Sequence, residues 1–161
     1  MQRRSFLGLS LSAAAASLLP LRLAHAELPE AADTSALIYI SPLNRQGGES
    51  SCQAEVWFQH HEGALYVVTA ASAWRAVAVG KGLSRARVWI GDVGPWKNSD
   101  GAYRALPAIQ AAGSLVGDKS VHGAVLARMG DKYSAEWRTW GPRFRDGLAD
   151  GSRVMLRYTP V

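Results

Sequence analysis

The feature that most limits the possible folds of this chain is a short apolar run that follows a tight turn. Residues 64–69 are rich in β-forming side chains, and a continuous run of this length is typical of a strand that is buried on both faces. Residues 60–63 form a polar turn that contains Glu62 and Gly63, and residues 52–58 before it alternate in part between polar and apolar side chains. This arrangement predicts a β-hairpin whose second strand lies inside the molecule.

Further strand patterns surround this hairpin along the chain. Residues 36–40, 85–90 and 153–158 have the β-branched, aromatic or alternating composition of strands, and we expect residues 103–116 to be extended as well. A turn at residues 44–49, which contains Asn and two Gly, separates the first strand from the hairpin. Mostly antiparallel strands of this length close into a barrel.

Helices are predicted at the periphery of this barrel. Residues 72–80 read as a short helix that Ser72 caps and Gly80 ends, and residues 120–133 have helical spacing.

The segment after the second helix is harder to assign. Residues 136–140 continue as helix or turn, and Gly141-Pro142 is expected to break that segment. Residues 143–148 then form a short amphipathic piece. The expected class is mostly β with peripheral helices and a mainly antiparallel sheet.

The cysteine count and the length exclude several kinds of protein. A chain of 161 residues fits one domain, and a single cysteine excludes an intramolecular disulfide framework and a cysteine-rich zinc site. We expect Cys52 to be a small buried hydrophobic residue. No stretch reaches the roughly 18 apolar residues of a membrane span, so the sequence predicts no stable membrane anchor.

The first 26 residues have the three parts of a secretory signal, namely a basic start, a short apolar middle and a small-x-small end. They also resemble the twin-arginine export signal. An ordinary signal, in which two arginines merely supply charge, is the alternative. The residues that carry both interpretations are Arg3, Arg4, Phe6, Leu7, Ala24 and Ala26.

This signal divides the chain and predicts where the protein works. Residues 1–26 would be cleaved, residues 27–35 form a polar arm, and residues 36–161 form the barrel domain. The expected location is periplasmic or extracellular, and the expected export partner is the twin-arginine machinery, which carries folded proteins. Cleavage removes three arginines and no acid, so the formal net charge falls from +5 to +2 (15 basic and 13 acidic residues). A net charge of +2 is too small to indicate a nucleic-acid-binding surface.

The order of elements resembles the flavin and deazaflavin split-barrel family, the pyridoxamine 5′-phosphate oxidase-like proteins. That family's central hairpin resembles residues 56–58, the Glu-Gly turn and residues 65–69 of this chain. The C-terminal part of the family's sequences is similar to residues 132–160. The turn at 44–48 looks like the phosphate-binding turn of the deazaflavin branch, although Asn44 and Gly47 depart from its pattern. The resemblance implies a split barrel, FMN or deazaflavin as cofactor, and a homodimer.

Candidate cofactor residues gather around the junction between the central strand and the short helix. A helix start offers free N–H groups to an anion, and an arginine can add a bidentate phosphate contact. In the alternative reading, Ser72 only caps the helix and Arg75 is a solvated charge. The residues predicted to bind the cofactor are Arg45, Thr69, Ser72, Trp74, Arg75, Lys81 and Arg87.

No catalytic side chain is predicted, since a bound flavin ring performs hydride transfer itself. The resemblance therefore implies a flavin- or deazaflavin-dependent oxidoreductase. The alternative is a non-enzymatic barrel that binds haem, another small molecule or a protein. His122, a lone histidine in a helix, is the candidate axial ligand in the haem version.

Six tryptophans and a histidine pair complete the candidates. Trp57 and Trp89 are expected in the core, whereas Trp74 and Trp96 stand beside loops and are candidates for ligand contact. Trp137 and Trp140 share a helix face and either fill the core or stack on a ring. The adjacent histidines at 60 and 61 are interpreted as part of a polar turn, because the ligand count that zinc requires is not reached nearby.

Overall fold

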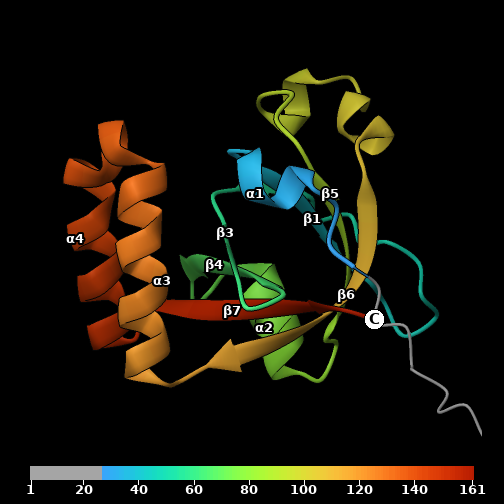
Figure 1. Cartoon of the computed structure of the whole chain (residues 1–161). Helices are drawn as coiled ribbons and strands as arrows, with labels where there is room; N and C mark the ends of the chain where they lie inside the picture. The colour runs from blue at the N-terminus through green and yellow to red at the C-terminus, as the bar shows by residue number, and fades with distance from the viewer. Residues whose placement is uncertain (1–26) are drawn as a thin grey trace, which may run out of the picture.

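The computed structural model describes residues 27–161 as one antiparallel sheet with helices on its outside (Figure 1). The predicted signal residues, from Arg3 to Ala26, lie outside the described part of the chain. The strands are β1 (Ile38–Pro42), β2 (Ala54–Val56), β3 (Gln59–His61), β4 (Ala64–Ala70), β5 (Arg85–Ile90), β6 (Ala108–Val116) and β7 (Arg153–Pro160). The helices are α1 (Ala31–Thr34), α2 (Trp74–Gly80), α3 (Lys119–Lys132) and α4 (Ser134–Asp150), with 3-10 turns η1 (Trp96–Asn98) and η2 (Ala102–Ala105).

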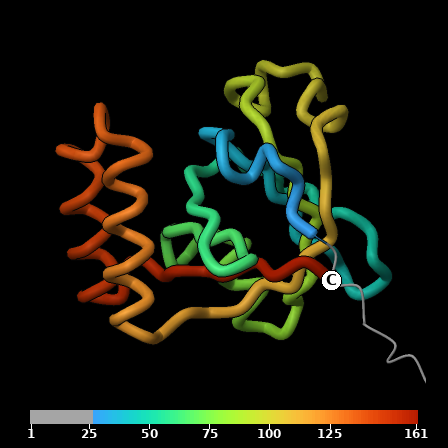
Figure 2. The backbone as a smooth tube through the Cα atoms, in the orientation of Figure 1, coloured from blue at the N-terminus to red at the C-terminus, as the bar shows by residue number. Residues whose placement is uncertain are grey.

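The sheet curls because its two edges are consecutive in sequence. The strand order is β2-β1-β5-β6-β7-β4-β3, so β2 and β3 are the outermost strands of the sheet. Only Trp57 and Phe58 separate them along the chain. A connection this short forces the two edges together, and the sheet becomes the curled half-barrel seen in Figure 2. The predicted fold class, mostly β with a split barrel and peripheral helices, is confirmed.

The interior of the curl is filled by apolar side chains from nearly every strand. Ile38, Leu65, Val67, Val88 and Leu156 are all fully buried there. Residues 65 to 68 of β4 are each less than 9% exposed, as a strand covered on both faces requires. One face of β4 meets the barrel interior and the other meets the helices.

A second apolar cluster joins α3 and α4 to the outer face of β4 and β7. Val125, Met129 and Phe144 from the helices pack against Tyr66 and Met155 from the strands. The helices lie side by side at one end of the sheet (Figure 1). None of the helices in the described region is long and apolar enough to cross a bilayer.

The seam between β2 and β3 is held by polar contacts from the end of α3. The Tyr133 hydroxyl accepts a hydrogen bond from the Phe58 N–H (2.9 Å) and lies 2.8 Å from the Phe58 carbonyl and 2.9 Å from that of Ala36. The Lys132 ammonium donates to the same Phe58 carbonyl at 3.2 Å and lies over the Phe58 ring. Because Phe58 is fully buried and lies between two strands, these side chains supply the partners that a sheet ladder would otherwise provide.

Two of the expected turns and breaks are wrong. His60 and His61 belong to β3, and the turn is confined to Glu62 and Gly63, whose positive φ values of 48° and 72° reverse the chain. The expected break at Pro142 does not occur, because α4 runs through it. Pro142 itself is exposed, whereas Trp137 and Phe144 on either side of it belong to the apolar cluster between the helices and the sheet, so tertiary packing holds both parts of α4.

Three smaller expectations are also corrected. Ala73, not Ser72, precedes the first residue of α2, and no side chain caps the helix, although Gly80 does end it. The extended segment begins at Ala108, because residues before it form the 3-10 turn η2. Cys52 is half-buried rather than buried, since it lies in the irregular segment before the edge strand β2.

Candidate functional site

The centre of the predicted site is a contact between the end of β4 and the start of α2. The Arg75 guanidinium donates a hydrogen bond to the buried Thr69 hydroxyl. Arg75 is half-buried, and within residues 27–161 no carboxylate lies within 4 Å of it. Burial raises the pKa of the nearby Tyr158, and the charge of Arg75 opposes that rise. The guanidinium is therefore oriented by one partner while its charge remains unneutralised.

The neighbouring candidates lie along the exposed side of α2. Ser72 is exposed just before the helix. Trp74 is 38% exposed, and the Lys81 ammonium lies 5.6 Å from the centre of its ring. This contact joins the two ends of the helix, which is only seven residues long. Because α2 is so short, its dipole attracts an anion only weakly, and Arg75 is the stronger candidate for binding a phosphate.

Arg45 lies in a different place, beside the turn that follows Lys81. It lines a small cleft of about 210 Å³ together with residues 82–85. The Asn44 carboxamide oxygen accepts hydrogen bonds from the N–H groups of Gln46 and Gly48, which fixes the turn that presents Arg45. The structure thus holds Arg45 on an exposed turn near the far end of α2.

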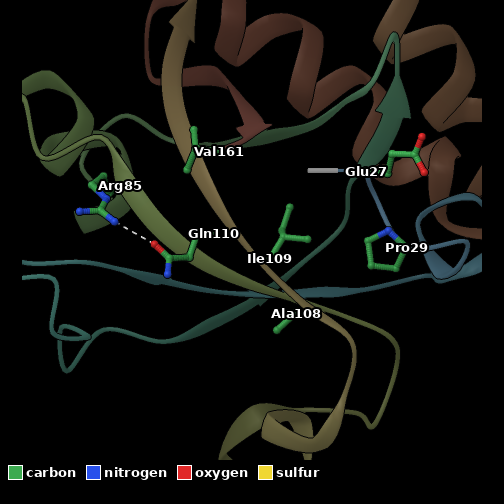
Figure 3. Close-up of a pocket in the computed structure, with 7 residues that line it drawn as sticks. All are labelled: Glu27, Pro29, Arg85, Ala108, Ile109, Gln110 and Val161. Atoms are coloured by element: carbon green, nitrogen blue, oxygen red, sulfur yellow. Dashed lines mark hydrogen bonds between the residues drawn. The ribbon is translucent and has the colours of Figure 1, made fainter. Parts of the chain in front are cut away.

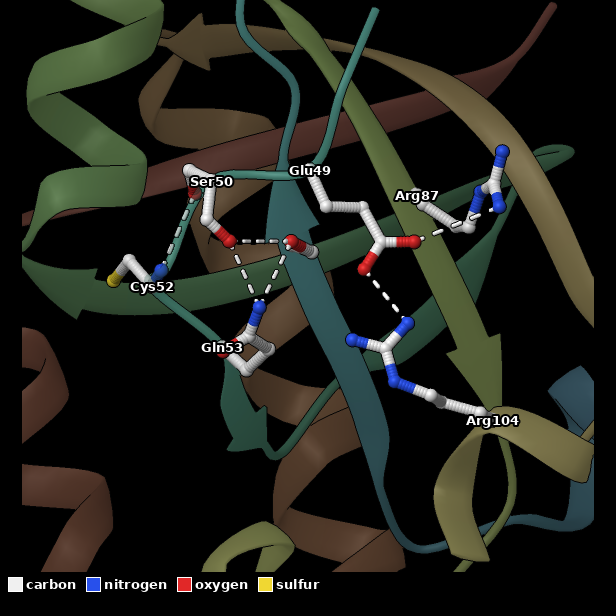
Figure 4. Close-up of polar contacts among 7 residues, drawn as sticks. Glu49, Ser50, Cys52, Gln53, Arg87 and Arg104 are labelled. Atoms are coloured by element: carbon white, nitrogen blue, oxygen red, sulfur yellow. Dashed lines mark hydrogen bonds and ion pairs between the residues drawn. The ribbon is translucent and has the colours of Figure 1, made fainter. Parts of the chain in front are cut away.

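Arg87 is already paired with a carboxylate (Figure 4). One Glu49 oxygen lies 3.5 Å from the Arg87 guanidinium, and the other accepts from Arg104 at 2.8 Å. Arg104 also lies over the rings of Trp89 and Tyr103. Because Glu49 neutralises much of this charge, Arg87 is a poorer phosphate ligand than Arg75.

The tryptophans divide between core and surface. Trp89 is 3% exposed, as expected for the core. Trp57 is half-buried and stacks on Tyr133 with ring centres 4.4 Å apart. Trp96, expected to contact a ligand, is half-buried and packs against the cluster of Trp89 and Tyr103.

Trp137 fills a slot between the two long helices. A Cβ on Gly130 of α3 or on Gly141 of α4 would lie 2.8 Å from its indole nitrogen. Trp140 packs edge-on to Trp57, with ring centres 6.1 Å apart. Both residues therefore belong to the packing between helices and sheet.

The candidate histidines make protein contacts. His60 Nδ1 lies 2.6 Å from an Asp33 carboxylate oxygen, which connects β3 to the N-terminal arm. His122 Nε2 lies 2.7 Å from the Val116 carbonyl oxygen. A carbonyl can only accept, so this nitrogen carries the proton and Nδ1 keeps the free lone pair. Within the described chain, no group of three or more metal-ligating side chains is close enough to hold an ion.

One cavity opens between the N-terminal arm and the last residue of the chain (Figure 3). It measures about 760 Å³ and contains none of the predicted cofactor residues. Its arginine, Arg85, donates to the Gln110 carboxamide at 2.8 Å. Glu27 and Val161 line the same cavity, so the two described ends of the chain lie close together.

Several contacts that organise the surface were not predicted from the sequence. Glu49 gives no signal on its own, because its partners are brought to it by strand pairing. The spacing of Lys119, His122, Gly123 and Leu126 on α3 does carry a signal, since these residues share one helical face and line one cavity. A search for a single apolar stripe would have overlooked this mixed face.

Proteins of known structure share this fold at low sequence identity. HutZ, the haem storage protein of Vibrio cholerae, is 17% identical over 82% of this chain and 86% of its own, with a TM-score of 0.54. An F420 reductase is 15% identical over 83% of this chain and 96% of its own, with a TM-score of 0.52. A FAD-binding protein of Mesorhizobium loti is 10% identical over 81% and 85%, with a TM-score of 0.50.

Sequence comparison adds nothing to this structural likeness. No protein-family model matches the chain, and no curated protein matches it significantly. At these identities the likeness establishes the architecture alone. The chain therefore has the split-barrel fold of these flavin-, F420- and haem-related proteins.

Proposed function

We propose that this protein binds FMN or a deazaflavin and acts as an oxidoreductase. The observation that carries the proposal is Arg75, a half-buried guanidinium that Thr69 orients and that no carboxylate within residues 27–161 neutralises. A cofactor phosphate would supply the missing negative charge and accept a paired hydrogen bond. The split-barrel likeness to an F420 reductase and a FAD-binding protein supports this choice of ligand.

The residues around Arg75 fit the rest of such a ligand. The exposed Ser72 hydroxyl is free to donate to a phosphate oxygen, and the exposed face of Trp74 offers a surface for a planar ring. Lys81 and Arg45 add positive charge at the far end of α2. When bound, the flavin ring supplies hydride transfer, and the residues of the chain bind and orient it.

Titration of the purified protein with FMN and with deazaflavin tests the proposal, with binding followed by cofactor fluorescence. Arg75→Ala should weaken binding by roughly 10- to 100-fold, as expected for a lost charged hydrogen bond. Thr69→Val keeps the charge but removes the orienting hydroxyl, so a smaller loss is expected. Arg138→Ala removes an exposed charge on α4 and serves as the matched control. Failure of both cofactors to bind at micromolar concentrations would exclude the proposal.

Haem binding without enzymatic activity is the second candidate, and His122 is the observation that favours it. Its Nε2–H bond to Val116 follows the pattern in which a metal-bound histidine donates its other ring nitrogen to a carbonyl. The visible spectrum separates the candidates, because haem gives a Soret band that flavins lack. Under the haem hypothesis, His122→Ala should abolish this band and Arg75→Ala should leave it intact.

We also propose that the protein is exported by the twin-arginine route and works as a homodimer. Replacing Arg3 and Arg4 with lysine should retain the precursor inside the cell, whereas general secretion would tolerate the change. Light scattering of the mature protein measures its mass in solution. A monomer that still binds a flavin would overturn the homodimer and leave the cofactor proposal standing.

A further inference from the structure

A groove of about 660 Å³ lies between the two long helices and the adjoining ends of β6 and β7. It is separate from the flavin site proposed above, because none of the predicted flavin-binding residues lines it, although His122, the candidate haem ligand, does. Apolar side chains from both helices and both strands line it, among them Leu115, Leu126, Leu148 and Met155. Pockets of this size and character hold small organic ligands.

The groove remains open because small residues line it. A Cβ built on Gly123 of α3 would meet no atom within 4 Å. Ala149 on α4 is similarly small. Leu115 is 53% exposed at the edge of the groove, which makes it one of the most exposed large apolar side chains in residues 27–161. The apolar surface here is left accessible to a ligand.

Apart from His122, whose Nε2 lies 2.7 Å from the Val116 carbonyl oxygen, the polar side chains that line the groove are cationic. Lys119 and Arg145 line it and are exposed, and no aspartate or glutamate is among its lining residues. Within residues 27–161 neither cation has a carboxylate within 4 Å. Arg153 also lines the groove, but its guanidinium lies over the rings of Trp140 and Phe144 and serves packing.

We propose that this groove binds an amphipathic carboxylate with a single acyl chain. The acyl chain would cover the leucines and Met155, and the carboxylate would lie between Lys119 and Arg145. A cationic amphiphile would be repelled by these side chains. A neutral one would gain only the apolar contacts. A nucleotide or sugar fits poorly, since its many polar groups would face a largely apolar floor.

Calorimetric titration with dodecanoate, below its micelle concentration, tests the proposal on the mature protein. Dodecanol and dodecyltrimethylammonium share the chain and lack the negative charge. We expect one dodecanoate per chain and about tenfold weaker binding of either control ligand. The double change Lys119→Gln, Arg145→Gln should weaken dodecanoate by about tenfold, and Arg128→Gln, an exposed charge on α3 outside the groove, should not.

A second variant tests the location independently of charge. Gly123→Leu fills the open space and should abolish binding while circular dichroism shows that the helices remain. Arg75→Ala should leave dodecanoate binding unchanged, so failure of the flavin proposal and failure of this one are distinguishable. Absence of dodecanoate binding, or binding that survives Gly123→Leu, would overturn the proposal. A dimer that Gly123→Leu splits, in a protein that binds no dodecanoate, would make the groove a contact between copies and would also overturn it.

Discussion

Two glycines on one helix should respond to the same substitution in opposite directions. Gly123 and Gly130 both lie within α3, and an alanine in a helix interior is favoured over glycine by about 1 kcal/mol. At Gly123 the new methyl group meets open space, so Gly123→Ala should raise the free energy of unfolding by roughly 0.5–1 kcal/mol. At Gly130 it would lie 2.8 Å from the indole nitrogen of Trp137.

The cost at Gly130 follows from how tightly Trp137 is held. Gly141 of α4 approaches the indole equally closely, so the ring cannot move away from one glycine without meeting the other. Overpacking of this kind costs about 1–3 kcal/mol. After the gain in helix propensity is subtracted, Gly130→Ala should lower the free energy of unfolding by as much as about 2 kcal/mol. The free energies of unfolding of Gly123→Ala and Gly130→Ala should therefore differ by the overpacking cost, about 1–3 kcal/mol.

Urea unfolding followed by circular dichroism measures both free energies of unfolding, provided that the slope of this free energy against urea concentration is the same in each variant. Tryptophan fluorescence gives a second readout, because a displaced Trp137 should change its emission in Gly130→Ala only. Equal stability changes in the two variants would refute the reasoning. Such a result would mean that the helices separate enough to accept a methyl group at no cost.

Three further changes test the seam and the surface ion pairs by urea unfolding. Tyr133→Phe leaves the buried Phe58 N–H without its acceptor and should lower the free energy of unfolding by about 1–3 kcal/mol. Tyr66 is similarly buried, but its hydroxyl makes no hydrogen bond inside residues 27–161, so Tyr66→Phe should lower that free energy by less. Burial lowers the pKa of Lys132 from 10.5 to about 8, so the unfolded chain binds more protons between these values and stability should rise with pH across them. Lys132→Met should remove that rise, and a rise that persists would point to other groups. Glu49→Gln removes the carboxylate between Arg87 and Arg104. It should lower the free energy of unfolding by roughly 1 kcal/mol at low salt and by less at high salt.

Local patterns in the sequence predict most of the sheet. Residues 64–69 and 85–90 carry strong strand composition, and the structure places strands there within one or two residues. Helix spacing likewise locates α3. The errors occur where tertiary contacts outweigh local preference. Helix α4 runs through the exposed Pro142 while Trp137 and Phe144 on either side of it pack in the helix–sheet cluster, and His60 is extended because β4 pairs with it.

The candidate site is only partly accessible to sequence reasoning. The proximity of Thr69 and Arg75 could be anticipated, since six residues across a strand-to-helix junction keep them close. The neutralisation of Arg87 could not, because Glu49 reaches it only once β1 and β5 are paired. For the same reason the seam contact of Tyr133 with Phe58 has no local signal, since 75 positions separate the two residues.

The position of β7 also governs when the molecule can form during its synthesis. This strand lies between β4 and β6, with Leu65 opposite Tyr158 and Val116 opposite Met155. A ribosome releases β4 and β6 well before β7, so a nascent chain exposes the apolar edge of β4 and cannot complete its sheet. Folding is therefore delayed until β7 has been synthesised, and the exposed edge is a natural target for chaperones in that interval. A transport system that accepts only folded cargo would consequently receive only copies in which β7 has been synthesised.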